Sequence, residues 1–239
     1  MRFTTSSAAA VLAASIPLVV AQTSTTCNPT EKSCPADTGL DATNYSVDFI
    51  NNSGANASWS EAIGTTLTYG DQGAEFIIAK TGEAPTVSAD FYFLFGRVDV
   101  KMQCAPGTGV ISSIVLESDD LDEIDYEILG GSNITEMVET NFFGKGNTTS
   151  YNRATYYAVS SPTSSFHTYS VDWNSERIEW IIDGTTVRTL EYTDPLTNGG
   201  TNYPQTPMRL KLGNWAAGAA GEPTGTVTWA GGSTDFSQA

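Results

Sequence analysis

"DEIDYEILGG" (residues 122–131) alternates acidic and apolar side chains at every second position. Successive side chains of a β-strand point to opposite faces, so a strand here places Glu123, Asp125 and Glu127 on one face and the apolar residues on the other. The pattern predicts a strand with its apolar face in a core. The acidic face is open to two interpretations: a solvated outer surface, or a functional groove. Three like charges in a row favour the groove, because their repulsion needs an offsetting reason.

Short β-rich runs surround this strand and are separated by Gly, Pro, Asn and Ser. We expect strands at 74–80, 90–103, 110–117, 122–129, 139–144, 167–174, 177–184, 186–192, 208–215 and 225–232. Asp183-Gly184 between two of these runs indicates a hairpin, since Gly accepts positive φ. About ten strands with turn signals between them predict an all-β chain that folds as one domain, an antiparallel β-sandwich or a barrel.

The first residues indicate export. Residues 1–21 read as a signal peptide with Arg2, an apolar stretch and Ala21 at the cleavage site, which leaves 22–239 as the mature domain. An uncleaved anchor is the alternative. No later run is long enough to span a bilayer, so no transmembrane segment is expected. We expect a secreted protein.

The cysteines and the glycosylation motifs agree with export. Cys27 and Cys34 in "CNPTEKSC" predict a small disulfide loop, which leaves Cys104 over. These two cysteines and His167 do not match a zinc spacing, and we expect neither a metal nor a cofactor. Acceptor sequons for N-glycosylation occur at Asn44, Asn51, Asn56, Asn133 and Asn147.

The charge balance limits the partners. A formal net charge of −16 and a pI near 4.2 argue against nucleic acid or an anionic membrane, because phosphate groups would be repelled. A neutral polymer would not be repelled. The alternative is that the charge serves only solubility.

The spacing of the two glutamates suits glycoside chemistry. Residues four apart in a strand have Cα atoms roughly 13 Å apart, and side chains leaning inward by roughly 4 Å each bring the carboxyl groups to about 5 Å, the separation of a retaining pair. Mutual repulsion would keep a proton on one glutamate while the other attacks, with Asp125 between them as a modulator. A calcium loop is excluded because no Gly follows at the required position.

The same residues resemble a known family. "DEIDYEILGG" resembles the E-x-D-x-E signature of glycoside hydrolase family 16, and "HTYSVDWNSERIEWIIDG" resembles the strand pair that follows it. "TNFFGKGNTTSYNR", "PQTPMRLKLGNWAAG" and "TVTWAGGSTDFS" are similar to the fungal Crh cell-wall transglycosylases. The resemblance covers residues 23–238, with several motifs in order.

The resemblance implies a concanavalin-like jelly roll with a concave sugar cleft, and an enzyme that cuts chitin and joins the chain to β-glucan or chitin. Glu123 would be the nucleophile, Asp125 its helper and Glu127 the acid/base. The substrate contacts would fall on Glu127, Lys211, Trp215 and Thr226. Alternation supports this in part, because Lys211 and Trp215 share one strand face. The alternatives are a β-glucanase or chitinase, and a carbohydrate-binding lectin. We expect a monomer in the cell wall.

Other residues are expected to be structural. We expect Tyr92, Phe93 and Phe95 in the core, packing roles for Trp173, Trp180 and Trp229, and a structural hydrogen bond for His167.

Family members usually continue beyond "WAGGSTDFS" with a further strand, and many then carry a glycolipid-anchor signal. We therefore expect either a fragment or a sheet without its last strand, and no anchor signal within these residues.

Overall fold

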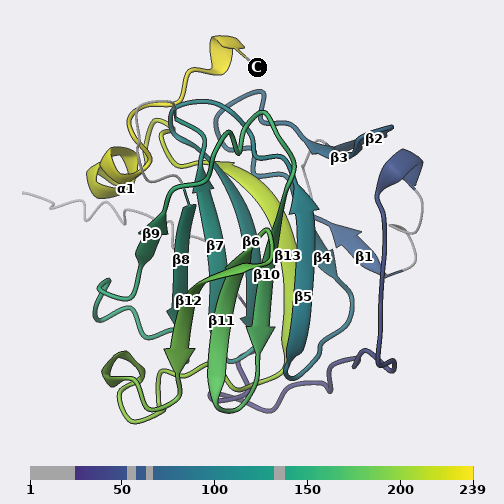
Figure 1. Ribbon diagram of the computed structural model, residues 1–239, viewed down its shortest axis with the longest axis vertical. Helices are drawn as coiled ribbons and strands as arrows, with labels where there is room; N and C mark the ends of the chain where they lie inside the picture. Colours follow the sequence, from purple (N-terminus) through teal and green to yellow (C-terminus); the bar gives the residue numbers. More distant parts are fainter. Residues whose placement is uncertain (1–24, 53–57, 63–66, 132–137, 239) are drawn as a thin grey trace, which may run out of the picture.

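The computed structural model is a sandwich of two antiparallel sheets (Figure 1), described for residues 25–52, 58–62, 67–131 and 138–238. The seven-stranded sheet has the order β1 (Trp59–Glu61), β4 (Thr86–Ala89), β13 (Met208–Ala216), β6 (Val110–Ser118), β7 (Glu123–Leu129), β8 (Val138–Phe143) and β9 (Thr155–Tyr157). The four-stranded sheet has the order β12 (Thr185–Glu191), β11 (Arg177–Ile182), β10 (His167–Trp173) and β5 (Gly96–Met102). The predicted all-β, antiparallel sandwich is confirmed.

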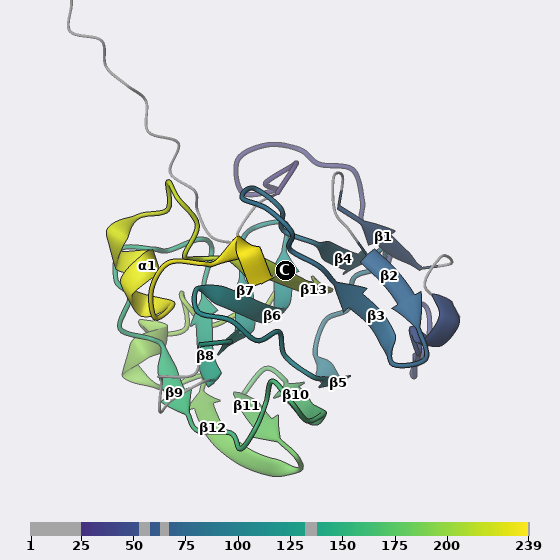
Figure 2. The same cartoon turned by 90° about the horizontal axis from the view of Figure 1, so that it is seen from above.

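A few short elements complete the chain. They are the hairpin β2 (Leu67–Gly70) with β3 (Gly73–Phe76), the helix α1 (Thr224–Trp229), and the 3-10 turns η1 (Ile50–Asn52), η3 (Pro195–Thr197) and η4 (Phe236–Gln238). In Figure 2 the seven-stranded sheet lies between the four-stranded sheet and α1. The helix therefore lies on the side of that sheet that faces away from the core.

The core fills the space between the two sheets. Ile124, Tyr126 and Ile128 of β7 are fully buried there, and Trp173 and Trp180 of the four-stranded sheet pack into the same cluster. The apolar half of the alternation thus faces inward as predicted, and these two tryptophans have the packing role expected of them.

Strand β7 is also fixed from its inner side by hydrogen bonds across the core. The Tyr126 hydroxyl donates to the carbonyl oxygens of Ser170 and Ile181, at 2.9 and 3.1 Å. The Trp180 indole donates to the carbonyl oxygen of Asp125 at 3.0 Å. Because buried polar groups need partners, these bonds fix where β7 sits relative to the opposite sheet. The carboxylates on its other face therefore have a rigid support.

The predicted strands are largely confirmed, with shifted boundaries. Residues 90–95 precede β5 rather than belonging to it, and the run at 74–80 is a strand only as far as Phe76. The hairpin at Asp183-Gly184 is confirmed, with both residues at positive φ. Asp183 also contacts His167 Nδ1 at 2.7 Å, which is the structural hydrogen bond expected for the histidine. The short strands β1, β2, β4 and β9 were not predicted.

The strand predicted at 225–232 is wrong, because this segment forms α1. Pro223 sits at the N-cap, and its carbonyl oxygen accepts from the Val227 amide at 3.0 Å. The helix ends before Gly231 and Gly232, whose φ values of 87° and 134° break the helical path. The β-branched residues of the segment favour a strand, but flanking Pro and Gly and the packing of the helix decide otherwise.

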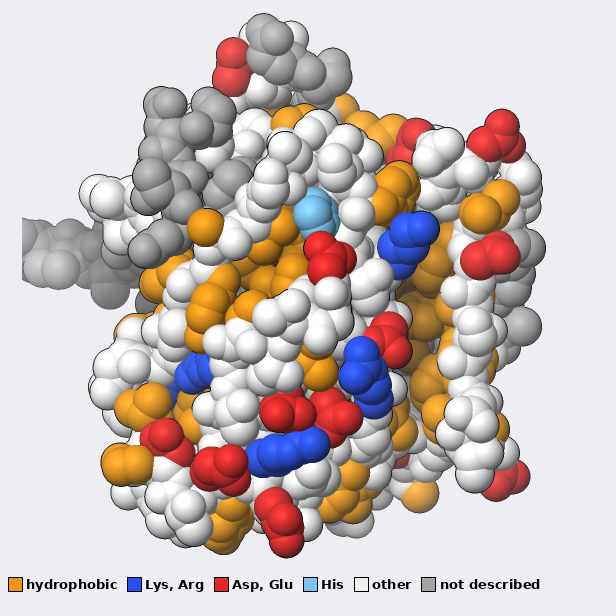
Figure 3. Space-filling model, in the orientation of Figure 1, with side chains coloured by type: hydrophobic (Ala, Val, Ile, Leu, Met, Phe, Trp, Pro, Cys, Tyr) orange, Lys and Arg blue, Asp and Glu red, His pale blue; other side chains and the backbone are white. Residues whose placement is uncertain are grey.

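The outer face of the four-stranded sheet has the usual character of a solvated surface. Figure 3 views this face, where acidic and basic side chains interleave. Arg97 pairs with Asp99 at 2.9 Å, and Arg177 contacts Asp172 at 2.9 Å and Glu179 at 3.0 Å. Mixed signs are what a solvated antiparallel sheet normally presents. The outer face of β7 differs from it in carrying three acids and no base.

The structure confirms the predicted disulfide, whereas several other features that indicate export lie outside the described residues. Cys27 and Cys34 form the predicted disulfide, and Cys104 is buried with its Sγ 3.5 Å from the Tyr169 hydroxyl. Residues 1–21, Asn56 and Asn133 lie outside the described residues. Within the described part of the chain, no helix has the length and apolar character needed to cross a membrane.

Candidate active site

The three acids of β7 lie together on the face turned away from the core. Glu123 is 5% exposed and Asp125 is 3% exposed, while Glu127 is half-buried. The surrounding side chains cover most of these carboxylates, so this face of the strand is not a solvated outer surface. The groove interpretation of the alternation is the one that fits this burial.

Two further acids share this face from the neighbouring strands. Glu117 of β6 lies directly opposite Glu123, and Glu139 of β8 lies directly opposite Glu127. Glu117 is 2% exposed and Glu139 is 5% exposed. We call the surface formed by Glu117, Glu123, Asp125, Glu127 and Glu139 the acidic face. Glu139 was not singled out in the sequence.

Burial and mutual repulsion together favour the protonated forms of these acids. Desolvation is the main cause that raises the pKa of Glu123, and the charges of Asp125 and Glu127 raise it further. Burial, then the charge of Glu139, raises the pKa of Asp125 to about 7. Burial also raises the pKa of Glu127, with added contributions from Asp125 and Glu139. Near neutral pH the acidic face therefore carries protons that isolated carboxylates would have lost.

A cation borders the Glu123 end of the acidic face. Lys211 of β13 forms an ion pair with Glu117, and both side chains are largely buried. Burial lowers the pKa of Lys211 to about 8, while the adjacent carboxylate favours its charged form. Lys211 therefore places a positive charge beside the site, on the strand face predicted for it.

Two tryptophans border the other end of the site. The indole of Trp215 on β13 donates to Glu127 Oε1 at 3.2 Å, and the indole of Trp229 on α1 donates to Glu139 Oε2 at 2.6 Å. The two rings stack, with centroids 6.0 Å apart and planes inclined by 25°. Trp215 is thus where the sequence predicted it. The sequence predicts only a packing role for Trp229, whereas the structure brings its indole to an acid of the site.

Thr226, the remaining residue of the predicted substrate contacts, lies on the same helix as Trp229. It belongs to α1, is half-buried, and its carbonyl oxygen accepts from the Ala230 amide. The structure thus brings Lys211 and Trp215 into contact with acids of the site, and puts Thr226 on the helix that carries Trp229. Its substrate contact stays a prediction.

The acids that precede β7 have structural roles. Asp122 is fully buried and accepts from Lys145 Nζ at 2.6 Å, from the Gln205 amide at 2.9 Å and from the Thr206 hydroxyl at 2.7 Å. Asp120 also contacts Lys145, at 3.2 Å. These bonds tie the turn before β7 to two distant loops. They fix the start of the strand, one residue before Glu123.

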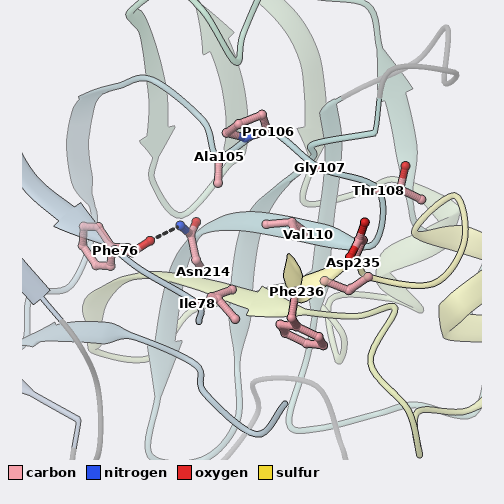
Figure 4. Close-up of a pocket in the computed structure, with 11 residues that line it drawn as sticks. Phe76, Ile78, Ala105, Pro106, Gly107, Thr108, Val110, Asn214, Asp235 and Phe236 are labelled. Atoms are coloured by element: carbon pink, nitrogen blue, oxygen red, sulfur yellow. Dashed lines mark hydrogen bonds between the residues drawn. The ribbon is translucent and has the colours of Figure 1, made fainter. Parts of the chain in front are cut away.

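A cavity of about 330 Å³ opens at one end of the sandwich, away from the acids (Figure 4). Val110 and Asn214 contribute to its lining, and Asn214 donates to the carbonyl oxygen of Phe76 at 2.9 Å. Asn214 alternates with Trp215 along β13, so it points to the opposite face of the sheet. The cavity and the acidic face are therefore separate features.

Comparison with known proteins gives a consistent set of relatives. Residues 51–231 match the family model for glycosyl hydrolases family 16. Crh-like protein 5 of Aspergillus fumigatus is 55% identical over 229 residues, covering 96% of this chain and 56% of the relative. Crh-like protein 2 of Botryotinia fuckeliana is 52% identical over 224 residues, covering 93% and 48%. The chain spans about half the length of the curated relatives it matches.

Solved structures of related proteins also superpose on this chain. A Crh5 transglycosylase in complex with NAG superposes with a TM-score of 0.84 at 54% identity, covering 89% of this chain and 85% of that one. A Bacillus licheniformis β-glucanase superposes with a TM-score of 0.63 at 22% identity, covering 80% and 92%. The second match concerns the fold alone.

Proposed function

The chain belongs to glycosyl hydrolase family 16, and from this we propose that it is a retaining transglycosylase that cleaves chitin and transfers the released chain to β-glucan or chitin. The observation that carries the proposal is the set Glu123, Asp125 and Glu127 on one strand face, the first two buried and the third half-buried, with Trp215 bonded to Glu127. A relative solved with NAG, the sugar unit of chitin, supports the choice of donor.

The first chemical step uses both glutamates. The Glu123 carboxylate attacks the anomeric carbon while Glu127 gives its proton to the glycosidic oxygen, so the old bond breaks and a glycosyl-enzyme ester forms. Burial, and then the charges of Asp125 and Glu139, raise the pKa of Glu127 and so help it to hold that proton until it is needed. Asp125 lies between the two glutamates, where it can hydrogen-bond the nucleophile.

The second step reverses the roles. Glu127, now a carboxylate, takes the proton of an acceptor hydroxyl, the acceptor oxygen bonds to the anomeric carbon, and Glu123 leaves as a carboxylate. Transfer wins over hydrolysis when a sugar hydroxyl occupies the position that water would take. The Trp215 and Trp229 rings support such an acceptor or donor, because indole faces stack on the apolar faces of sugar rings.

The biological setting follows from the relatives. Relatives named Crh-like, and one described as a transglycosylase, support a role in joining cell-wall polysaccharides outside the cell. The partners of the site are then chitin and β-glucan. The acidic character of the chain is compatible with such neutral polymers.

Product analysis tests the proposal against its two rivals. The protein is incubated with a chitin oligosaccharide donor and fluorescent β-glucan or chitin acceptors, and the products are read by mass spectrometry. We expect lengthened labelled acceptors. Shortened donor alone would identify a hydrolase, and unchanged sugars with measurable binding would identify a lectin. Either of these results overturns the proposal.

A further inference from the structure

Glu139, a deeply buried acid next to the catalytic set, has no role in the chemistry described above. It lies on β8 directly opposite Glu127, so the two side chains project side by side from adjacent strands. Cβ atoms of directly opposite residues lie about 5 Å apart, which is close enough for strong interaction between their carboxyl groups. Glu139 is 5% exposed, so solvent screens this interaction little.

Glu139 is held in place by donors from two other elements. Trp229 of α1 donates to its Oε2 at 2.6 Å, and Tyr156 of β9 also hydrogen-bonds its carboxylate. Both donors favour the charged form of an acceptor carboxylate. Burial still raises the pKa of Glu139, but the hydrogen bonds and the charge of Arg188 oppose that effect. The two donors and the charge of Arg188 thus stabilise the Glu139 carboxylate beside Glu127 against the effect of burial.

The contacts close into a ring. Glu139 bonds Trp229, Trp229 stacks on Trp215, Trp215 bonds Glu127, and Glu127 lies opposite Glu139. A change in Glu139 therefore reaches Glu127 by two routes, directly through charge and indirectly through the stacked indoles. Substitutions can separate these routes, because one depends on the negative charge and the other on a hydrogen-bond acceptor.

We propose that Glu139 is a positioning residue for Glu127: its charge keeps the proton on Glu127, and its hydrogen bond fixes Trp229 against Trp215. The inference rests on the proposed function, in which Glu127 is the acid/base. The charged and titratable groups on and around the acidic face are Glu123 and Asp125 on β7, Glu139 on β8, Tyr156 on β9, Arg188 on β12 and the Lys211–Glu117 pair. Of these, Glu139 is the acid that shares a direct cross-strand position with Glu127.

The test compares Glu139→Gln with Trp229→Phe. Glu139→Gln keeps an oxygen acceptor for Trp229 and removes the charge, whereas Trp229→Phe keeps the charge and removes the donor. In Glu139→Gln the alkaline limb of the transglycosylation pH profile, which reports loss of the Glu127 proton, should move to lower pH by about one pH unit. In Trp229→Phe the limb should stay in place while KM rises, because the stacked platform is disturbed.

Two results would overturn the inference. One is a Glu139→Gln limb that coincides with the parent limb, which would leave Glu139 only a structural role. The other is an equal shift in both variants, which would show that the charge is not the cause. Thermal unfolding of each variant checks that the fold is intact.

A titration of the parent protein tests the inference without any activity. Side-chain carboxyl carbons followed by ¹³C NMR should show Glu127 and Glu139 titrating as a coupled pair, each with two steps. Independent single-step curves would contradict the proposal even if Glu139→Gln did not fold. An inactive parent would refute the proposed function, while this titration would still decide the coupling.

Discussion

Asp125→Asn should make the fold more stable at neutral pH and leave it unchanged in acid. Asp125 is 3% exposed, and burial raises its pKa to about 7. A group whose folded pKa is raised contributes stability below its unfolded pKa, and that contribution is lost as the pH rises through the folded value. The amide has no proton to lose, so the variant avoids this loss. The difference between variant and parent should therefore grow between about pH 4 and pH 7.

The magnitude follows from the same pKa. A rise in the pKa from an ordinary value of about 3.9 to about 7 means that the parent loses about 4 kcal/mol of stability at high pH, where Asp125 is ionised. Only part of this is regained in the variant, because the NH2 group of Asn replaces a carboxyl oxygen and does not reproduce every contact of the protonated acid. We expect a net gain of about 2 kcal/mol at pH 8, or roughly 4–8 °C in melting temperature for a chain of this size. At pH 4 and below we expect no gain.

Urea unfolding at pH 4, 6 and 8 measures the effect. Asp71→Asn, at an exposed position in the β2–β3 turn, makes the same change in charge where no burial acts. A gain that is equal at all three pH values, or one that Asp71→Asn reproduces, would refute the reasoning. Activity should fall in Asp125→Asn, because Asp125 is the proposed helper of the nucleophile. The repulsion between the carboxylates costs stability, and a variant that removes it gains stability at the expense of activity.

Three further substitutions test other parts of the site and its support. Glu123→Gln should abolish both transfer and hydrolysis while the melting temperature at pH 7 is at least that of the parent, because burial also raises the pKa of Glu123; retained activity in the product assay would exclude this residue as the nucleophile. Lys211→Met should lower the free energy of unfolding by about 3 kcal/mol at pH 7, because it removes the ammonium that contacts the buried Glu117; Lys211→Arg, which keeps the charge, should lose less. Gly144→Ala should cost about 2 kcal/mol, since a Cβ there would lie 2.6 Å from the backbone carbonyl carbon of Asn202; a parent-like unfolding curve would contradict this.

Local pattern was enough to predict the strand that carries the acids. Alternation in a strand fixes which residues share a face without any knowledge of the partner strands. Glu123, Asp125 and Glu127 could therefore be assigned to one face, and Ile124 and Ile128 confirm the other by their complete burial. The hairpin at 183–184 is another local feature, because its signal is the conformational freedom of one glycine.

Features that depend on strand register could not be predicted in the same way. Glu139 alternates with Thr140 in its own strand, but only pairing with β7 sets it opposite Glu127. A one-residue slip would turn Glu139 to the core instead. Trp229 was missed for a different reason. Thr, Val and Trp favour strands, and the short helix that presents Trp229 is decided by flanking Pro223 and Gly231 and by tertiary packing.

A buried cation on the core side partly offsets the repulsion among the acids that share one face. Arg188 enters from the four-stranded sheet, with its guanidinium 4.5 Å from the Trp180 ring centroid and Nη1 donating to the Thr140 carbonyl at 2.7 Å. It is buried beneath the strands that carry the acids, and its charge lowers the pKa of both Asp125 and Glu139. Trp180, on which it lies, also donates to the backbone of Asp125. Arg188 thus adds to Lys211, which pairs with Glu117 on the acidic face itself, a second cation on the core side that offsets the repulsion without covering the outer side of the carboxylates.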